Sequence, residues 1–257
     1  MDLVIKKKLF VVTGSSSGLG AAIAKLLLAE GATVLLNARS EDKLKLLQAD
    51  FSENAEVLVG DITSDATISE LIRKIGDRQL SGILVNAGGP PASSFIATEM
   101  QEWDQAYHTV LRWKVKLTKA ILPLMQNNKY GRIVYIESAS VKQPIENLVL
   151  SNSLRLAVVG FVKTLSQEVA REGITLNVVA PGYHNTSRLQ GLIQKKSELT
   201  GLSVDQVKEA FMNQTLVGDL GEAEDLATLA VWLLSPHSKY VTGQTITIDG
   251  GLVSNTL

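Results

Sequence analysis

Short apolar runs alternate along this chain with longer segments whose apolar residues recur at helical spacing. The runs are Leu9–Val12, Thr33–Leu36, Glu56–Val59, Ile83–Val85, Arg132–Ile136, Ile174–Val179 and Thr245–Ile248. Each run is too short for a helix, and most are apolar at successive positions, as strands covered on both faces are. The pattern therefore predicts seven buried β-strands.

The segments between the runs carry helix signals. One helix closes at Gly31, a second extends from a cap at Ser64 to Gly76, and two longer helices span Glu99–Met125 and Leu148–Arg171. Strands that alternate with helical crossovers of this length predict an α/β fold: a doubly wound, parallel, seven-stranded sheet with helices on both faces, the Rossmann fold. A barrel is the alternative, and the loop after the first strand argues against it.

Length and composition narrow the picture. The 257 residues fit one domain over 1–257, and the net charge of −1 gives no general attraction to nucleic acid or anionic membranes. The chain has no cysteine, which excludes disulfides and cysteine-ligated metals. No stretch approaches the ~18 apolar residues of a membrane span, and Met1–Phe10 lacks the order of charges typical of a signal peptide. We expect a soluble cytoplasmic protein without a metal site.

A glycine-rich segment, Thr13–Gly20, follows the first predicted strand and precedes the first predicted helix. Its three glycines allow a sharp turn and close approach of the backbone to a pyrophosphate, with helix N–H groups directed at the anion. A glycine triplet alone is a weak signal. In this strand–turn–helix position it predicts a dinucleotide-binding loop.

The end of the second strand indicates which dinucleotide binds. An NAD site places a carboxylate there for the ribose 2′-hydroxyl, whereas a nearby arginine suits a 2′-phosphate. The chain has Ala38 followed by Arg39, so the repelling carboxylate is absent and a guanidinium is present. The sequence therefore favours NADP over NAD, although Arg39 is alternatively a solvated residue at a helix start.

Six motifs in order resemble the short-chain dehydrogenase/reductase family, in particular its β-ketoacyl-acyl-carrier-protein reductase-like branch. They are Thr13–Gly20, Asp61-Ile62, Asn86–Gly89, Gly131–Val134, Asn177–Gly182, and Val241–Gln244 leading to Asp249–Gly251. The resemblance covers nearly the whole chain, and it implies a small-molecule substrate with a carbonyl or a secondary alcohol. The substrate stays open between a ketoacyl thioester, a sugar and a small hydroxy compound.

The resemblance also implies the residues that hold the cofactor. Gly14, Ser16, Ser17, Gly18, Leu19 and Gly20 would hold the pyrophosphate and the adenosine side, Asp61 and Ile62 would flank the adenine, Asn86, Ala87 and Gly88 would support the adenosine ribose, and Pro181, Gly182 and Thr186 would line the nicotinamide. All of these residues follow the carboxyl ends of predicted strands, where a doubly wound sheet opens its ligand crevice.

The catalytic positions depart from the family's serine, tyrosine, lysine and asparagine. Ser138 matches the serine, but Ser151 stands at the tyrosine position, Arg155 at the lysine position and Val110 at the asparagine position. A serine hydroxyl is far less acidic than a phenol, and arginine stays charged, so Arg155 can hold a ribose or stabilise an alkoxide but cannot exchange protons. Ser138, Ser151 and Arg155 are the candidate catalytic residues.

Three residues near these motifs are possible replacements for the tyrosine. Lys142 follows Ser138 by four residues, and Tyr183 and His184 follow Pro181-Gly182. Packing is the favoured role for His184, and solvated or substrate-contact roles are favoured for the other two. Glu137 alternates to the opposite side of its strand from Ser138 and is an expected ion-pair partner.

The remaining features concern access to the site, assembly and the other two histidines. The resemblance implies that 187–216 is a substrate lid, the alternative being a helical surface insertion, and that the chain forms a homotetramer or homodimer through its long helices. His108 and His237 have no companions at metal-ligand spacing and are expected at the surface.

Two functions stay open. The favoured function is an NADP(H)-dependent oxidoreductase with an altered proton donor; the other is a catalytically silent dinucleotide-binding sensor or assembly subunit.

Overall fold

Seven parallel strands form one sheet in the order β3-β2-β1-β4-β5-β6-β7. We describe residues 2–256 from a computed structural model of the chain. The strands are β1 (Leu9–Thr13), β2 (Thr33–Ala38), β3 (Ala55–Val59), β4 (Leu80–Val85), β5 (Gly131–Ile136), β6 (Ile174–Pro181) and β7 (Thr245–Ile248). Each predicted run lies within one of them or overlaps it almost completely, so the doubly wound Rossmann fold is confirmed and the barrel is excluded.

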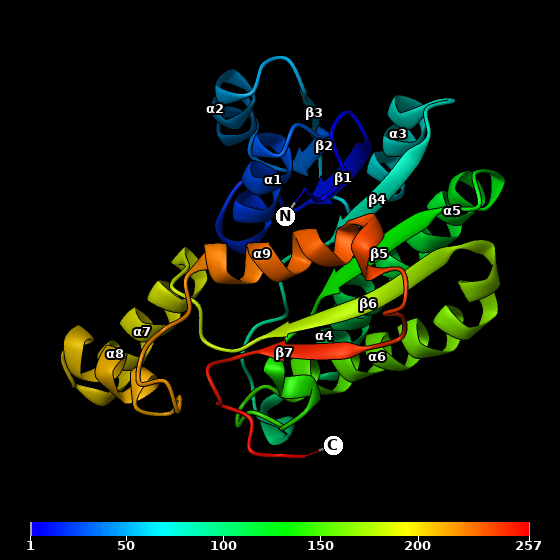
Figure 1. Cartoon of the computed structure of the whole chain (residues 1–257). Helices are drawn as coiled ribbons and strands as arrows, with labels where there is room; N and C mark the ends of the chain where they lie inside the picture. The colour runs from blue at the N-terminus through cyan, green and yellow to red at the C-terminus, as the bar shows by residue number, and fades with distance from the viewer. Residues whose placement is uncertain (1, 257) are drawn as a thin grey trace.

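Helices cover both faces of the sheet (Figure 1). The elements are α1 (Gly18–Ala29), α2 (Glu41–Asp50), α3 (Asp65–Ile75), α4 (Met100–Ala106), α5 (Trp113–Asn127), α6 (Val149–Val169), α7 (Ser187–Thr200), α8 (Val204–Met212) and α9 (Ala223–Leu234). One apolar core lies between the sheet and α1, α2 and α9, and a second lies between the sheet and α3, α5 and α6. Burial on both faces explains why the strands are continuously apolar.

The predicted helix limits agree closely with the structure, with one informative difference. The Ser64 side chain caps α3 by accepting a hydrogen bond from the Thr67 N–H, and Gly76 ends that helix with a positive φ of 58°. The predicted helix Glu99–Met125 is helical over its length, but a π-helical stretch at Tyr107–Arg112 separates α4 from α5. No helix among residues 2–256 is long and apolar enough to span a bilayer.

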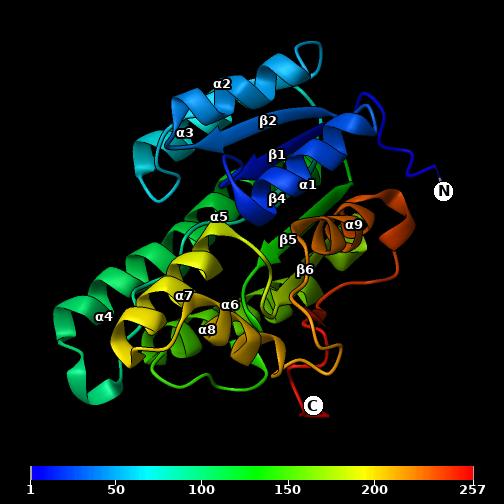
Figure 2. The same cartoon turned by 90° about the vertical axis from the view of Figure 1, so that its left-hand side faces the viewer.

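Helices α7 and α8 stand apart from the two layers in Figure 1, and Figure 2 shows them next to one another. They have a small core of their own, made of Leu189, Ile193, Val207 and Leu220. They occupy most of the segment 187–216, so this predicted insertion is a helical pair attached to the sheet after β6. Thr186 begins α7, and its side chain accepts a hydrogen bond from the Leu189 N–H at 3.5 Å.

Candidate active site

A cavity of about 870 Å³ opens beyond the carboxyl ends of β1 to β6. Nearly every residue predicted to contact the cofactor lines it. These are Gly14, Ser16, Ser17, Gly18, Leu19, Arg39, Asp61, Ile62, Asn86, Ala87, Gly88, Arg155, Pro181, Gly182 and Thr186. The three candidate catalytic residues, Ser138, Ser151 and Arg155, line the same cavity. The tertiary structure thus brings the two predicted groups of residues together.

The glycine-rich loop is as tightly packed as its sequence predicts. A Cβ on Gly20 would lie 2.2 Å from the Gly14 carbonyl oxygen, and Gly14 has a positive φ of 65° that other residues rarely adopt. Gly20 does not line the cavity, so its role is to let the start of α1 approach the loop. Gly18 lies beside Thr186, because a Cβ there would be 3.4 Å from the threonine methyl carbon.

A hydrogen-bonded tie fixes the loop beside the end of β4. The Thr13 hydroxyl donates to the Asn86 carbonyl oxygen at 2.7 Å and accepts from the Asn86 N–H at 2.8 Å. Thr13 is fully buried, so these bonds form away from competing water. They hold the β4 loop, with Asn86, Ala87 and Gly88, at a set position against the glycine-rich loop.

Arg39 follows β2, which lies three strands away from β5 in the sheet, so Arg39 is at the opposite end of the cavity from Ser138. It is exposed, and among residues 2–256 no carboxylate pairs with it. Lys43, one turn further along α2, lines the cavity as well. Ala38 contributes no charge, and Asp61 binds the N–H and hydroxyl of Thr63 at 2.9 and 2.8 Å. This end of the cavity is suited to a phosphate on the adenosine ribose.

Two of the three candidate catalytic side chains, Ser151 and Arg155, are joined by a direct hydrogen bond. Arg155 Nε donates to the Ser151 Oγ at 3.0 Å, and both side chains are buried at adjacent turns of α6. Ser138 Oγ accepts from the Ser140 N–H at 3.2 Å. In both contacts the serine oxygen is the acceptor, so each hydroxyl keeps its own proton for a group inside the cavity.

Arg155 belongs to a buried ion-pair cluster with Glu137 and Lys114, and no sequence pattern had pointed to Lys114. Arg155 Nη1 donates to the Glu137 carbonyl oxygen and to its carboxylate, each at 3.0 Å. The Lys114 ammonium on α5 binds the other carboxylate oxygen of Glu137. The expectation that Glu137 forms an ion pair is confirmed. Burial lowers the pKa of Lys114, and the Glu137 charge opposes that shift.

The position of the expected asparagine lies in a distorted part of the helix. Val110 is buried within the π-helical stretch Tyr107–Arg112, and Lys114 follows it by one turn. Single π-helical turns inside α-helices are frequent at functional sites. Val110 offers no polar group at this place, whereas the buried Lys114, one turn further along, carries an ammonium group.

The three possible replacements for the catalytic tyrosine differ in whether they line the cavity and in how burial shifts their pKa. Lys142 does not line the cavity, whereas Tyr183 and His184 do. Tyr183 donates its hydroxyl to Gln214 at 3.2 Å, packs edge-on against Phe211, and has its pKa raised by burial. Burial lowers the pKa of His184, whose Nδ1 contacts the Gly182 carbonyl oxygen. Both shifts move the pKa of the ring away from neutral pH, where an acid or base catalyst works best.

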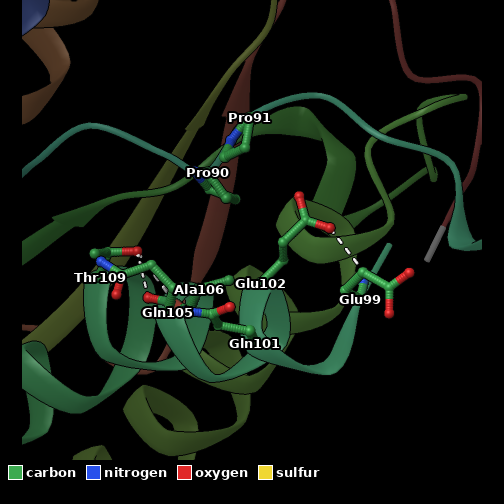
Figure 3. A pocket seen from close by; sticks show the side chains of 8 residues that line it. All are labelled: Pro90, Pro91, Glu99, Gln101, Glu102, Gln105, Ala106 and Thr109. Atoms are coloured by element: carbon green, nitrogen blue, oxygen red, sulfur yellow. Dashed lines mark hydrogen bonds between the residues drawn. The ribbon is translucent and has the colours of Figure 1, made fainter. Parts of the chain in front are cut away.

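A smaller pocket of about 400 Å³ adjoins the cavity over α4 (Figure 3). Pro90 and Pro91 form one wall, and polar side chains of α4, including Glu102 and Gln105, form the other. Glu102 accepts a hydrogen bond from the Glu99 N–H at 2.8 Å, so its carboxylate is occupied in capping the helix. The two prolines and Gln105 line both spaces, which gives the cavity a side extension.

The two other histidines lie where the sequence predicts them. His108 is exposed in the π-helical stretch and packs edge-on against Tyr107. His237 is exposed, and its Nε2 lies 2.7 Å from the Asp2 carbonyl oxygen. Both contacts are structural, and both residues lie outside the cavity.

Comparison with known proteins agrees with the fold and the site. Residues 14–253 match the family described as Enoyl-(Acyl carrier protein) reductase. The 3-oxoacyl-[acyl-carrier-protein] reductase FabG of Haemophilus influenzae is 33% identical over 247 residues, which cover 95% of this chain and 98% of that protein. The chain therefore belongs to the short-chain dehydrogenase/reductase family, in the branch similar to the 3-oxoacyl reductases.

Two solved structures share the fold over nearly their whole length. YwfH, described as an NADPH dependent reductase involved in bacilysin biosynthesis, has a TM-score of 0.92 and 25% identity, with 97% of this chain and 100% of that chain covered. Actinorhodin polyketide ketoreductase with NADPH has a TM-score of 0.91 and 27% identity, with 97% and 98% covered. The likeness extends over all seven strands of the sheet.

Proposed function

We propose that this chain is an NADP(H)-dependent oxidoreductase acting on a carbonyl or a secondary alcohol, with Ser138, Ser151 and Arg155 as its catalytic residues. The observation that carries the proposal is the 3.0 Å hydrogen bond from Arg155 Nε to Ser151 Oγ inside the cavity that also contains the glycine-rich loop. The NADPH of the two similar reductases supports the choice of cofactor.

The residues present fit such a cofactor. The backbone of Gly14 to Leu19 would hold the pyrophosphate. The loop keeps this shape only with glycine at position 14, because a Cβ there would lie 2.9 Å from the Asn86 side chain. Arg39 would hold the ribose 2′-phosphate, and Asp61 and Ile62 would lie beside the adenine. Pro181, Gly182 and Thr186 would line the nicotinamide, with Arg155 near its ribose. When bound, NADPH supplies a hydride to the substrate carbonyl carbon.

Two serine hydroxyls neutralise the negative charge that develops on the substrate oxygen. As the carbon–hydride bond forms, Ser138 donates a hydrogen bond to that oxygen, and Ser151 transfers its proton to it. The O–H bond of Ser151 breaks, Arg155 stabilises the alkoxide that remains, and a water molecule returns the proton while the hydroxide so formed is neutralised in the solvent. Glu137 holds the Arg155 fork in place through two bonds. Since serine is a weaker acid than tyrosine, turnover is slower than with the usual catalytic centre.

Ser151→Ala tests this mechanism. NADPH oxidation is followed at the nicotinamide absorbance with a 3-oxoacyl thioester, a ketose and a simple ketone. We expect the variant to lose about 10²–10⁴-fold in rate, the usual contribution of a positioned acid, and to bind NADPH as the parent does. Ser153→Ala, at an exposed position of the same helix, is the matched control. Full activity of Ser151→Ala would contradict the role of Ser151.

A catalytically silent dinucleotide-binding protein is the second candidate. One observation favours it: Ser151 stands at the position of the usual tyrosine, and Tyr183, which lines the cavity, has its hydroxyl bound to Gln214 and its pKa raised by burial. The two candidates differ in whether the parent chain oxidises NADPH with any carbonyl compound.

A further inference from the structure

A second arginine, Arg188, lies beside Arg155 at the substrate end of the cavity. It belongs to the first turn of α7, and it lines the cavity. A Cβ placed on Gly89 would lie 2.6 Å from Arg155 Nη2 and 3.0 Å from Arg188 Nη2. Both guanidinium groups therefore rest against the same glycine of the β4 loop, close enough for one carboxylate or phosphate to contact both.

These charges are not balanced by the protein. Glu137 is the carboxylate that lines this end of the cavity, and it is already bound to Lys114 and Arg155. Within residues 2–256, the Arg188 side chain has neither a hydrogen bond nor an ion pair. Even if Lys114 gave up its proton, two arginines would face one carboxylate. A surplus positive charge in a cavity attracts an anionic ligand and opposes a cationic one.

The local electrostatics agree with this geometry. Arg188 can be reached from solvent, yet the protein around its head group and the neighbouring Arg155 charge lower its pKa. Two like charges at this distance repel one another, and an anion between them removes the repulsion. The carboxylates Glu99 and Glu102 line the smaller pocket over α4 and not this cavity.

The position of Arg188 points to the substrate and away from the pyrophosphate. The start of α7 meets the glycine-rich loop at Thr186, which lies beside Gly18. Arg188 is placed beyond that contact, against Gly89 and Arg155, at the end of the cavity that carries Ser138 and Ser151. We propose that Arg188, together with Arg155, binds an anionic group of the substrate, so that the enzyme prefers oxo acids or phosphorylated carbonyl compounds to neutral ones. This inference rests on the proposed function.

The test compares an anion with its neutral counterpart in the NADP⁺-bound protein, because the oxidised cofactor cannot reduce either compound. Acetoacetate and methyl acetoacetate are titrated by calorimetry into the parent, Arg188→Gln and Lys195→Gln. Lys195 is exposed on the same helix and does not line the cavity, so its variant removes an equal charge elsewhere. We expect the parent and Lys195→Gln to bind acetoacetate about tenfold or more tightly than the ester, and Arg188→Gln to lose that preference, as the loss of a charge-assisted hydrogen bond implies.

Two results would overturn the proposal. One is equal binding, or no binding, of the two compounds by the parent. The other is a large loss of NADPH affinity in Arg188→Gln with the preference for acetoacetate intact, which would assign Arg188 to the cofactor pyrophosphate. NADPH affinity and NADPH oxidation are measured separately on the same samples. A parent that binds NADPH and acetoacetate without oxidising NADPH would contradict the proposed function while supporting the anion site.

Discussion

The two ends of the cavity are built in different ways. The adenosine end is formed mainly by backbone: the glycine-rich loop, the Thr13–Asn86 tie and the turn after β2. The catalytic end is formed by side chains from α5, α6, α7 and the end of β5, and the resemblance leads us to expect other residues at three of its positions. Backbone shape depends on a few glycines, whereas a charge network of side chains can be exchanged as a unit. The cofactor end can thus persist while the chemistry changes.

The largest expected effect concerns the catalytic end. In the double variant Ser151→Tyr with Arg155→Lys, turnover of the parent's own substrate should fall about 10²–10⁴-fold. Lysine cannot reproduce the three bonds that the Arg155 fork makes to Ser151 and Glu137, and the tyrosine ring takes up substrate space. NADPH fluorescence should show that cofactor binding is retained. A silent parent and an active double variant would instead favour the silent binding protein.

The charge cluster should matter more for stability than any surface pair. Glu137→Gln leaves Lys114 and Arg155 buried without a carboxylate, and we expect it to lower the free energy of unfolding by about 3–5 kcal/mol in denaturant titration. Glu56→Gln is the matched control, because its pair with Arg78 is solvent-exposed and should contribute only ~0.2–1 kcal/mol. Similar losses of unfolding free energy in the two variants would mean that the buried cluster stabilises the fold no more than a surface ion pair does.

At the adenosine end, the effect should be specific to one cofactor. Arg39→Ala should weaken NADPH binding by about 1–3 kcal/mol, the contribution of a charge-assisted hydrogen bond, and leave NADH binding unchanged. The parent should bind NADPH more tightly than NADH, as measured by nicotinamide fluorescence. Lys45→Ala, at an exposed position of α2 paired with Glu41, should change neither affinity. Equal affinity of the parent for both cofactors would refute the assignment of NADP.

Of the two buried sites tested for stability, the glycine-rich loop should show the smaller effect. Gly20→Ala places a Cβ against the Gly14 carbonyl oxygen, so we expect overpacking to cost about 1–3 kcal/mol of folding free energy. Gly191→Ala in α7 is the control, because a Cβ added there has no atom within 4 Å. It should leave stability unchanged or raise it by up to ~1 kcal/mol. Thermal unfolding with and without NADPH separates the folding cost from loss of binding. A neutral Gly20→Ala would show that the loop tolerates a shift.

The sequence alone determined the strands, the sheet class and the glycine-rich loop, and it selected the candidate catalytic residues that the structure brings to one cavity. These features follow from local patterns: continuous apolar runs, caps such as Ser64 and Gly76, and motifs at strand ends that a parallel sheet brings to one edge. Only the tertiary structure decided that Lys114 meets Glu137, that Arg155 turns toward both Glu137 and Ser151, and that Arg188 lies against Gly89. Glu137 lies 23 residues from Lys114 and 18 from Arg155, on a separate element from each. No local pattern encodes such contacts, because they depend on how helices pack across the sheet.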